Sequence, residues 1–290
     1  MNVLNYSYGA DVGGQAIRIK QAFDKHSDFY YRTATGKTNY LKYPTDLHIR
    51  NCKPETFDVL HVNRKYRGLP LMPSVVHYHG TKFRNQPTAH LAEQRKRRAV
   101  GLVATLDLWL LAPDKTEWLP APYDLDWLAG MAKPHSGRTL RIGHAPTDRP
   151  TKSTAAFLEA VDRLSKKHRV KLVLIERRPW AKCLELKADL DVYFDQVILG
   201  YGNNAIEAWG MGIPVIAGAQ PDTLAEMGNR FPIPFYEATE DTIYDALLAM
   251  TDPDIRAEYA VKGLEHVRRF HAEELVVRQL EGVYRKAKES

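Results

Sequence analysis

Cysteine is scarce in this sequence: only Cys52 and Cys183 occur among 290 residues, and they form no CxxC pair. This usage argues against a disulfide framework and against a zinc site. No apolar run approaches the roughly 20 residues that span a bilayer. The start, residues 1–6, lacks a basic region followed by a long apolar one, so it does not resemble a signal peptide. We therefore expect a globular, cytoplasmic protein.

An excess of one charge sign is present but small. The 41 lysines and arginines exceed the 35 acidic residues, for a net charge of +6. Such a balance favours contact with a polyanion, which includes nucleic acid, an anionic membrane surface and phosphorylated substrates. The densest basic run is Arg95-Lys96-Arg97-Arg98. It fits a solvated helix face as well as a surface for a polyanionic partner.

Short apolar runs alternate with helical stretches through the first half of the chain. This rhythm is typical of βα units around a parallel sheet. Apolar residues at helical spacing predict a helix over 15–26, after a glycine-bearing loop, and a basic helix is expected near 93–98. The strands that we expect here cover 2–6, 29–32, 58–62, 74–79, 101–105 and 108–112.

The alternation restarts after Trp118-Leu-Pro-Ala-Pro122, where two close prolines break regular structure. Strands are expected over 140–144, 170–175, 191–194 and 213–217, with helices over 153–168, 179–188 and 203–209 between them. Beyond residue 239 the spacing is helical, and a long terminal helix of this kind is able to pack back on the first domain. We predict an α/β protein with two Rossmann-like domains, residues 1–120 and 121–290.

The most informative stretch runs from Gly200 to Ala217. Gly202, Asn203 and Asn204 tolerate unusual backbone angles before a helix whose first N–H groups attract a phosphate. Tyr201 lies in the same loop. Glu207 follows one turn into the helix, where a carboxylate is placed to accept hydrogen bonds from vicinal hydroxyls such as those of a ribose. A structural carboxylate favoured by the helix dipole is the alternative for Glu207.

Residues 207–217 read EAWGMGIPVIA, which resembles the EAMAxGxPVIA helix of GT-B fold glycosyltransferases, in particular glycosyltransferase family 4. Residues 142–152 and 191–196 look like two further stretches of that family. The resemblance implies two Rossmann-like domains facing across a cleft. It also implies that Glu207 holds the donor ribose, that Arg149 and Lys152 neutralise the diphosphate, and that transfer retains the anomeric configuration. No metal or other cofactor is implied, and a nucleotide-diphosphate sugar is the co-substrate.

The first domain resembles the family mainly by pattern. Gly13 and Gly14 open its first helix, where the family brings the backbone close to the donor phosphates. His79 ends the strand 74–79 near the place of the reacting sugar in the family, and His77 shares its face if the strand is regular. Asp11 precedes the glycine pair and is a candidate for contact with the acceptor. A tight turn and packed histidines are the plain structural alternatives.

One position departs from the family pattern. Many members have a second glutamate eight residues before the ribose-binding one, and this chain has Leu199 there. The missing contact with the sugar must come from elsewhere, such as Asn203, Asn204 or backbone N–H groups. The identities of the sugar and of the nucleobase therefore stay open.

The expected function is transfer of a sugar from a nucleotide donor to an acceptor hydroxyl. The acceptor is a glycan or lipid-linked precursor, a small metabolite, or a hydroxylated base in DNA, for which Arg97 and Arg98 are the candidate contacts. A nucleotide-sugar epimerase on the same fold is a second possibility. A nucleic-acid-binding module with a degenerate sugar site is a third.

Overall fold

The computed structural model describes residues 1–11, 13–63, 65–133 and 137–289. The chain divides into two compact units. Unit 1 contains Met1–Tyr123 and Phe270–Ser290, and unit 2 contains Asp124–Arg269. The sequence had suggested a division after residue 120 with all terminal helices in the second domain. The contacts of the terminal segment place it in unit 1 instead.

Unit 1 is built on a parallel sheet of seven strands in the order β3-β2-β1-β4-β5-β6-β7. The order reverses at β1, so that β2 and β3 lie on one side and β4 to β7 on the other. In such doubly wound sheets ligands bind outside the carboxyl ends of the strands where the order reverses. The strands are β1 Asn2–Ser7, β2 Tyr30–Thr35, β3 Leu47–His48, β4 Val59–Asn63, β5 Ser74–Tyr78, β6 Val100–Val103 and β7 Glu117–Trp118.

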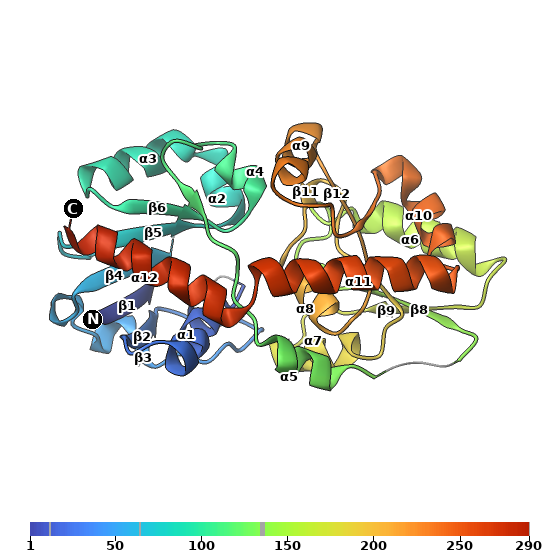
Figure 1. Ribbon diagram of the computed structural model, residues 1–290, viewed down its shortest axis with the longest axis horizontal. Helices are drawn as coiled ribbons and strands as arrows, with labels where there is room; N and C mark the ends of the chain where they lie inside the picture. The colour runs from blue at the N-terminus through green and yellow to red at the C-terminus, as the bar shows by residue number, and fades with distance from the viewer. Residues whose placement is uncertain (12, 64, 134–136, 290) are drawn as a thin grey trace. The chain divides into compact units, whose positions relative to one another are not determined.

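Helices cover both faces of this sheet (Figure 1). Alternate strand residues point to opposite faces, and one apolar set, which includes Val3, Val59 and Val75, packs under α1 and α12. The intervening set, which includes Leu60 and Val76, packs on the other side against α2 and α4. The helices of unit 1 are α1 Gln15–His26, α2 Gly80–Asn85, α3 Pro87–Lys96, α4 Leu106–Trp109 and α12 Glu273–Glu289, with short 3₁₀ turns at Ile49–Asn51 and Pro54–Thr56.

The terminal helix α12 packs on the sheet of unit 1, as the helical spacing at the end of the chain had suggested. It runs alongside β4 and β5 and contacts α1 (Figure 1). Its buried stripe includes Val276, Leu280 and Tyr284, which recur at the three- and four-residue intervals of an amphipathic helix. Tyr284 lies 253 positions from Tyr31 of β2 in the sequence, yet their hydroxyls are 3.2 Å apart.

The strand expected over 108–112 was wrong, because this stretch begins with the short helix α4. Leu106 and Leu108 are both buried, although strand alternation would also have allowed that. The local polar contacts decide the matter. Thr105 donates to Asp107 Oδ1 at 2.5 Å, and Asp107 accepts from the Arg84 guanidinium, which fixes a turn at the point where β6 ends.

Unit 2 has a second, smaller α/β layer structure. Its sheet order is β11-β12-β10-β8-β9, with β13 also paired to β12, and only β11 runs antiparallel to its neighbour among the named pairs. The strands are β8 Leu140–His144, β9 Val170–Leu174, β10 Val192–Phe194, β11 Leu199–Gly200, β12 Val215–Ala219 and β13 Tyr236–Glu237.

The main core of unit 2 lies between this sheet and helices α6 and α10. Phe157 of α6 stacks on Phe194 of β10, with ring centroids 4.5 Å apart. On α8, the fully buried Trp209 contacts the ring of His266 of α11. The helices are α5 Leu125–Met131, α6 Thr154–Ser165, α7 Trp180–Lys187, α8 Asn203–Gly210, α9 Pro221–Arg230, α10 Ile243–Ala249 and α11 Pro253–Phe270, with a 3₁₀ turn at Glu240–Thr242.

Within the described ranges, none of these helices is both long and apolar enough to cross a membrane.

Candidate functional site

The strand order of unit 2 reverses at β8, with β9 on one side and β10 on the other. The loops that leave the carboxyl ends of β8 and β10 therefore meet at the place where open α/β sheets bind ligands. The first loop, residues 145–153, leads into α6. The second, residues 195–202, leads into α8. These loops contain four of the residues selected from the sequence, Arg149, Lys152, Tyr201 and Gly202, and α8 contains three more, Asn203, Asn204 and Glu207.

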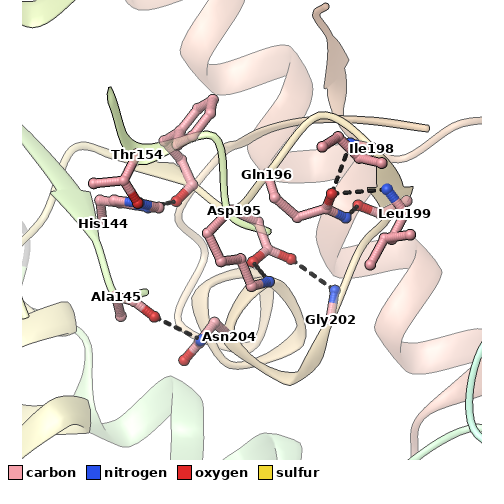
Figure 2. A network of polar contacts seen from close by, with 12 residues as sticks. His144, Ala145, Thr154, Asp195, Gln196, Ile198, Leu199, Gly202 and Asn204 are labelled. Carbon is pink, nitrogen blue, oxygen red and sulfur yellow. Dashed lines mark hydrogen bonds and ion pairs between the residues drawn. The ribbon is translucent and has the colours of Figure 1, made fainter. Parts of the chain in front are cut away.

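His144 joins the ends of these elements. Its Nδ1 lies 3.0 Å from the carbonyl oxygen of Phe194, which only accepts, so Nδ1 carries the hydrogen. Nε2 therefore accepts from the Thr154 hydroxyl at 2.8 Å, as Figure 2 shows. Burial lowers the pKa of His144 to about 4, so the ring is neutral at pH 7. The end of β8, the end of β10 and the start of α6 are thus held together by one neutral side chain.

Asp195 is the first residue of the second loop, directly after β10, and it joins this loop to Lys152 (Figure 2). Its Oδ2 accepts from the backbone N–H of Gly202 at 2.7 Å, and its Oδ1 lies 2.6 Å from the Lys152 ammonium. The Asp195 side chain is buried, whereas Lys152 is 18% exposed. A buried carboxylate thus holds a partly exposed cation beside the start of α8.

A second ion pair lies beneath α8. Lys187 of α7 is fully buried and forms a close ion pair with Glu207, which is 2% exposed. The Lys187 ammonium also donates to Asn204 Oδ1 at 2.5 Å, and Trp180 Nε1 donates to Glu207 Oε1 at 2.8 Å. Asn204 in turn donates to the carbonyl of Ala145 at 3.2 Å (Figure 2). Lys187 and Trp180 were not selected from the sequence.

We call Lys152, Asp195, Lys187, Glu207, Asn204 and Gly202 the switch-point cluster. It combines one partly exposed ammonium, the N-terminus of an eight-residue helix and a carboxylate fixed in orientation. The positive charge and the helix terminus both favour an anion such as a phosphate. A carboxylate has about four lone-pair sites. On Glu207 the bonds from Lys187 and Trp180 use two of these sites and fix the orientation of the carboxylate.

Three other selected residues of unit 2 have different surroundings. Arg149 is exposed and forms a two-pronged ion pair with Glu176, whose hydrogen bonds raise the pKa of Arg149. Tyr201 points inward: it is buried, and its hydroxyl lies 2.8 Å from His266 Nε2, so it supports the loop. Asn203 is half-buried as the first residue of α8.

In unit 1, Asp11 acts on the backbone. It is buried, and its two carboxylate oxygens accept from the N–H groups of Ala16 and Ile17 at 3.0 and 3.1 Å. Burial raises its pKa, against the opposing effect of these hydrogen bonds. Asp11 therefore caps α1 and already uses two of the N–H groups that a phosphate at this helix would need.

Gly13 and Gly14 both adopt the left-handed conformation, with φ of 59° and 69°. A Cβ on Gly14 would lie 2.6 Å from the ring of Tyr43, so a side chain is excluded there on two grounds. The Gly13 carbonyl accepts a close hydrogen bond from Arg18, a buried cation over the ring of Tyr123. The glycine pair thus forms a tight turn with positive charge beneath it.

His79 is the end of a larger polar arrangement. On one face of the sheet, three neighbouring strands change from valine to polar residues toward their carboxyl ends: Val3, Asn5 and Ser7; Val59, His61 and Asn63; Val75, His77 and His79. The polar members are all buried. Each strand alternates in this way by itself, but only the register of the three strands brings the polar residues together, and only His77 and His79 were selected from the sequence.

These side chains, with Tyr31 and Tyr284, form one hydrogen-bonded series that we call the polar chain. Its contacts are His79 Nε2 to Asn63 Oδ1 (3.2 Å), Asn63 Nδ2 to Asn5 Oδ1 (2.5 Å) and Ser7 Oγ (2.9 Å), Asn5 Nδ2 to Tyr31 OH (2.8 Å), Tyr31 OH to Tyr284 OH (3.2 Å), Tyr284 OH to His61 Nδ1 (2.6 Å) and His61 Nε2 to His77 Nδ1 (3.2 Å). The rings of His77 and His79 are 4.1 Å apart. Each residue of the polar chain is at least nine-tenths buried.

The basic run at the end of α3 divides into two kinds of residue. Arg97 donates to Glu93 and to the carbonyls of Pro70 and Leu69, and its guanidinium lies over the ring of Tyr66. It is therefore a structural side chain. Arg95, Lys96 and Arg98 are exposed, and Arg98 has a φ of 53°.

The sequence contains two D-x-D pairs, Asp124 with Asp126 and Asp189 with Asp191, and one member of each has a structural role. Asp191 accepts from the backbone N–H of Arg141 at 2.7 Å, and Asp124 caps α5 by accepting from Trp127 at 2.9 Å. Among the described residues, no group of three or more histidine, cysteine or acidic side chains is arranged to hold a metal ion.

Comparison of the sequence with protein-family models and with curated proteins gives no significant match. Solved structures do match along nearly the whole chain. HepE from Anabaena, in complex with UDP and glucose, is 13% identical with a TM-score of 0.69, over 99% of this chain and 100% of that one. A glycosyltransferase from Rickettsia africae is 10% identical with a TM-score of 0.67, over 99% and 98%.

A third match is an alpha-glucosyltransferase in complex with UDP and a 13-mer DNA that contains an HMU base. It is 8% identical with a TM-score of 0.63, over 98% of this chain and 99% of that one. The two Rossmann-like units and these matches define an α/β protein with the GT-B fold, the fold that the EAMAxGxPVIA-like helix had indicated. At these identities the likeness concerns the fold, and the function must be argued from the site.

Proposed function

We propose that this protein is a glycosyltransferase that transfers a sugar from a nucleotide-diphosphate sugar to an acceptor hydroxyl. The observation that carries the proposal is the switch-point cluster. Its carboxylate, partly exposed ammonium and helix N-terminus suit the ribose and diphosphate of such a donor in chemical type, and they lie at the kind of sheet edge where open α/β sheets bind ligands. Two of the structural neighbours have UDP bound, which is consistent with this assignment.

In this proposal Glu207 accepts from the ribose hydroxyls, and Lys152 and Arg149 neutralise the charge that develops on the departing diphosphate. Gly202, Asn203 and Asn204 shape the donor loop, and Gly13 and Gly14 let the backbone of unit 1 approach the donor. The imidazole of His79 contacts the reacting sugar. Asp11 and Tyr201 support these loops. We further propose retention of configuration, without a metal.

Nucleoside diphosphates are expected to raise the melting temperature of the protein, because a ligand that binds only the native state stabilises it by mass action. At a ligand concentration 100 times the dissociation constant, the free energy of unfolding rises by about 2.7 kcal/mol. Differential scanning fluorimetry with a panel of nucleoside diphosphates and nucleotide sugars measures it. The matched variant is Glu207→Gln, which should lose most of the shift; its unliganded melting temperature should also fall, because Lys187 is left buried without its anion. Folded protein that responds to no member of the panel would contradict the proposal.

An epimerase on the same fold would need no acceptor. Product formation from the nucleotide sugar alone therefore distinguishes the two enzymes. A binding module with a degenerate site would show neither reaction, and its affinity for nucleic acid would survive Glu207→Gln.

For the acceptor we propose a glycan or lipid-linked precursor, or a hydroxylated base in DNA, and a specific observation favours testing DNA first. One structural neighbour is bound to DNA with an HMU base, and this chain exposes Arg95, Lys96 and Arg98 at the end of α3. Exposed cations contribute salt-dependent affinity for phosphates.

Replacing Arg95, Lys96 and Arg98 together by Ala is expected to weaken binding of HMU-containing DNA. The salt slope of log K should fall by about one for each phosphate that the variant no longer neutralises. Arg97 is left in place because of its structural contacts. The control variant is Lys166→Ala with Lys167→Ala, which removes two exposed lysines of unit 2. An unchanged salt slope in fluorescence anisotropy would exclude this run as a DNA contact.

A further inference from the structure

The polar chain of unit 1 begins and ends on histidines of the same strand end. His79 lies at one end and His77 at the other, with their rings 4.1 Å apart. Six consecutive hydrogen bonds join seven of its members, so that each inner member can accept from one neighbour and donate to the next. Buried series of this kind hold their members in one arrangement only when the hydrogens run consistently through them.

The direction of the first half follows from the asparagines. The amide nitrogen of Asn63 donates to Asn5 and Ser7, so its oxygen is the acceptor and His79 Nε2 carries the donated hydrogen. The amide nitrogen of Asn5 then donates to the Tyr31 hydroxyl at 2.8 Å. Tyr31 accepts there, which leaves its own hydrogen for the next member.

The second half continues in the same direction. The Tyr31 and Tyr284 hydroxyls are 3.2 Å apart, and either oxygen could donate; because Tyr31 already accepts from Asn5, we assign its hydrogen to Tyr284, and Tyr284 then donates to His61 Nδ1 at 2.6 Å. Burial lowers the pKa of His61 to about 3, so the ring is neutral and its one hydrogen lies on Nε2. That hydrogen goes to Nδ1 of His77, and burial keeps the pKa of His77 well below its ordinary value.

His77 is therefore the last link. Its Nδ1 accepts, so its hydrogen lies on Nε2, and this buried atom has no hydrogen-bond partner among the described residues. A buried N–H without an acceptor is unfavourable. The hydrogen of His77 can therefore move between its two ring nitrogens unless the other members of the polar chain prevent this exchange. The ring of His79 packs directly against that of His77.

We propose that Tyr284 of α12 is a positioning residue for the two histidines at the carboxyl end of β5. By donating to His61, the Tyr284 hydroxyl fixes the hydrogen of His61 on Nε2 and so the hydrogen of His77 on Nε2. His77 is then held as one tautomer beside the ring of His79. The inference rests on the proposed function in one respect: the fixed tautomer of His77 keeps His79 in the orientation that the transfer reaction needs.

The test is Tyr284→Phe in the full chain, with histidine ¹⁵N spectra at pH 7 as the first readout. In the unsubstituted protein His61 and His77 should each show a protonated Nε2 and an unprotonated Nδ1. In the variant both should show averaged shifts, because His61 has lost its donor. We expect kcat/KM for transfer to fall about tenfold to a hundredfold through misplacement of His79, with the dissociation constant for nucleoside diphosphate unchanged.

Tyr78→Phe is the matched control. Tyr78 lies on the same strand, its side chain points to the opposite face, and its hydroxyl is 3.0 Å from the carbonyl of His90 and from Gln94 Oε1. Its loss should lower stability and leave the spectra of His61 and His77 unchanged. If Tyr284→Phe does not fold, His61→Leu removes the link between Tyr284 and His77 and should give averaged ¹⁵N shifts for His77.

Two results would overturn the inference: a hydrogen on Nδ1 of His77 in the unsubstituted protein, or unaltered histidine spectra in a folded Tyr284→Phe variant. Both are observed without substrate. Absence of transferase activity in a protein with the expected spectra would instead count against the proposed function alone.

Discussion

Replacement of Lys187 by Met is expected to lower the free energy of unfolding by about 3–5 kcal/mol, because it leaves the carboxylate of Glu207 buried without its cation. Lys187 is fully buried and Glu207 is 2% exposed, so water does not compensate for the loss. Asn204 loses a hydrogen-bond donor at the same time. Urea denaturation followed by circular dichroism measures the change.

The chain offers a control on the same helix. Lys182 of α7 is exposed and pairs with Glu185 at 2.6 Å, so Lys182→Met should cost less than about 1 kcal/mol. A further variant separates stability from function. Lys187→Met combined with Glu207→Leu replaces both charges by apolar groups and should recover most of the stability, yet it should not bind nucleoside diphosphate. Equal stability of Lys187→Met and Lys182→Met would show that the buried pair is not a unit.

The second large effect is expected at Lys152, where replacement by Met should lower kcat/KM for sugar transfer by about 10²–10³-fold. This is the usual loss when one preorganised group that stabilises developing negative charge is removed. Lys152 is the partly exposed cation of the switch-point cluster, and Asp195 holds it beside the start of α8. Initial rates over a range of donor concentrations give kcat/KM.

Loss of Lys152 also leaves Asp195 buried without its cation, which lowers stability. The double variant Lys152→Met with Asp195→Asn avoids this, since an asparagine oxygen still accepts from Gly202. It should fold as well as the unsubstituted protein and show the same loss in kcat/KM. Lys166→Met, at an exposed lysine just beyond α6, is the activity control. A double variant that keeps kcat/KM within threefold of the original value would remove Lys152 from the diphosphate site.

Local patterns predicted much of the fold because they are repeated in the sequence. The helix over 15–26 and the strand over 140–144 have the same bounds in the structure, since glycines and sharp changes in polarity mark their ends. The stretch 108–112 was misassigned because its apolar residues suit a strand as well as a helix. The polar contacts of Asp107 that decide between them involve Arg84, more than twenty positions away.

The site was predicted in part for a related reason. Glycines, asparagines and Glu207 form a local motif, and the structure brings Lys152 to the same place. Lys187 had no such signal, because a lysine on a helix is normally solvated, and its partner Glu207 comes 20 positions later. His61 and Asn63 became recognisable only through the register of three neighbouring strands, which one strand by itself does not reveal.

The return of α12 to the first sheet also has a consequence for biosynthesis. Unit 2 is continuous in the sequence, whereas the segment that completes unit 1 is translated after it. Val3, Val59 and Val75 share their core with Val276 and Leu280, so this core closes only when α12 has left the ribosome. The usual order, in which the N-terminal domain matures first during synthesis, is thus reversed: unit 2 is able to fold while unit 1 still exposes one apolar face.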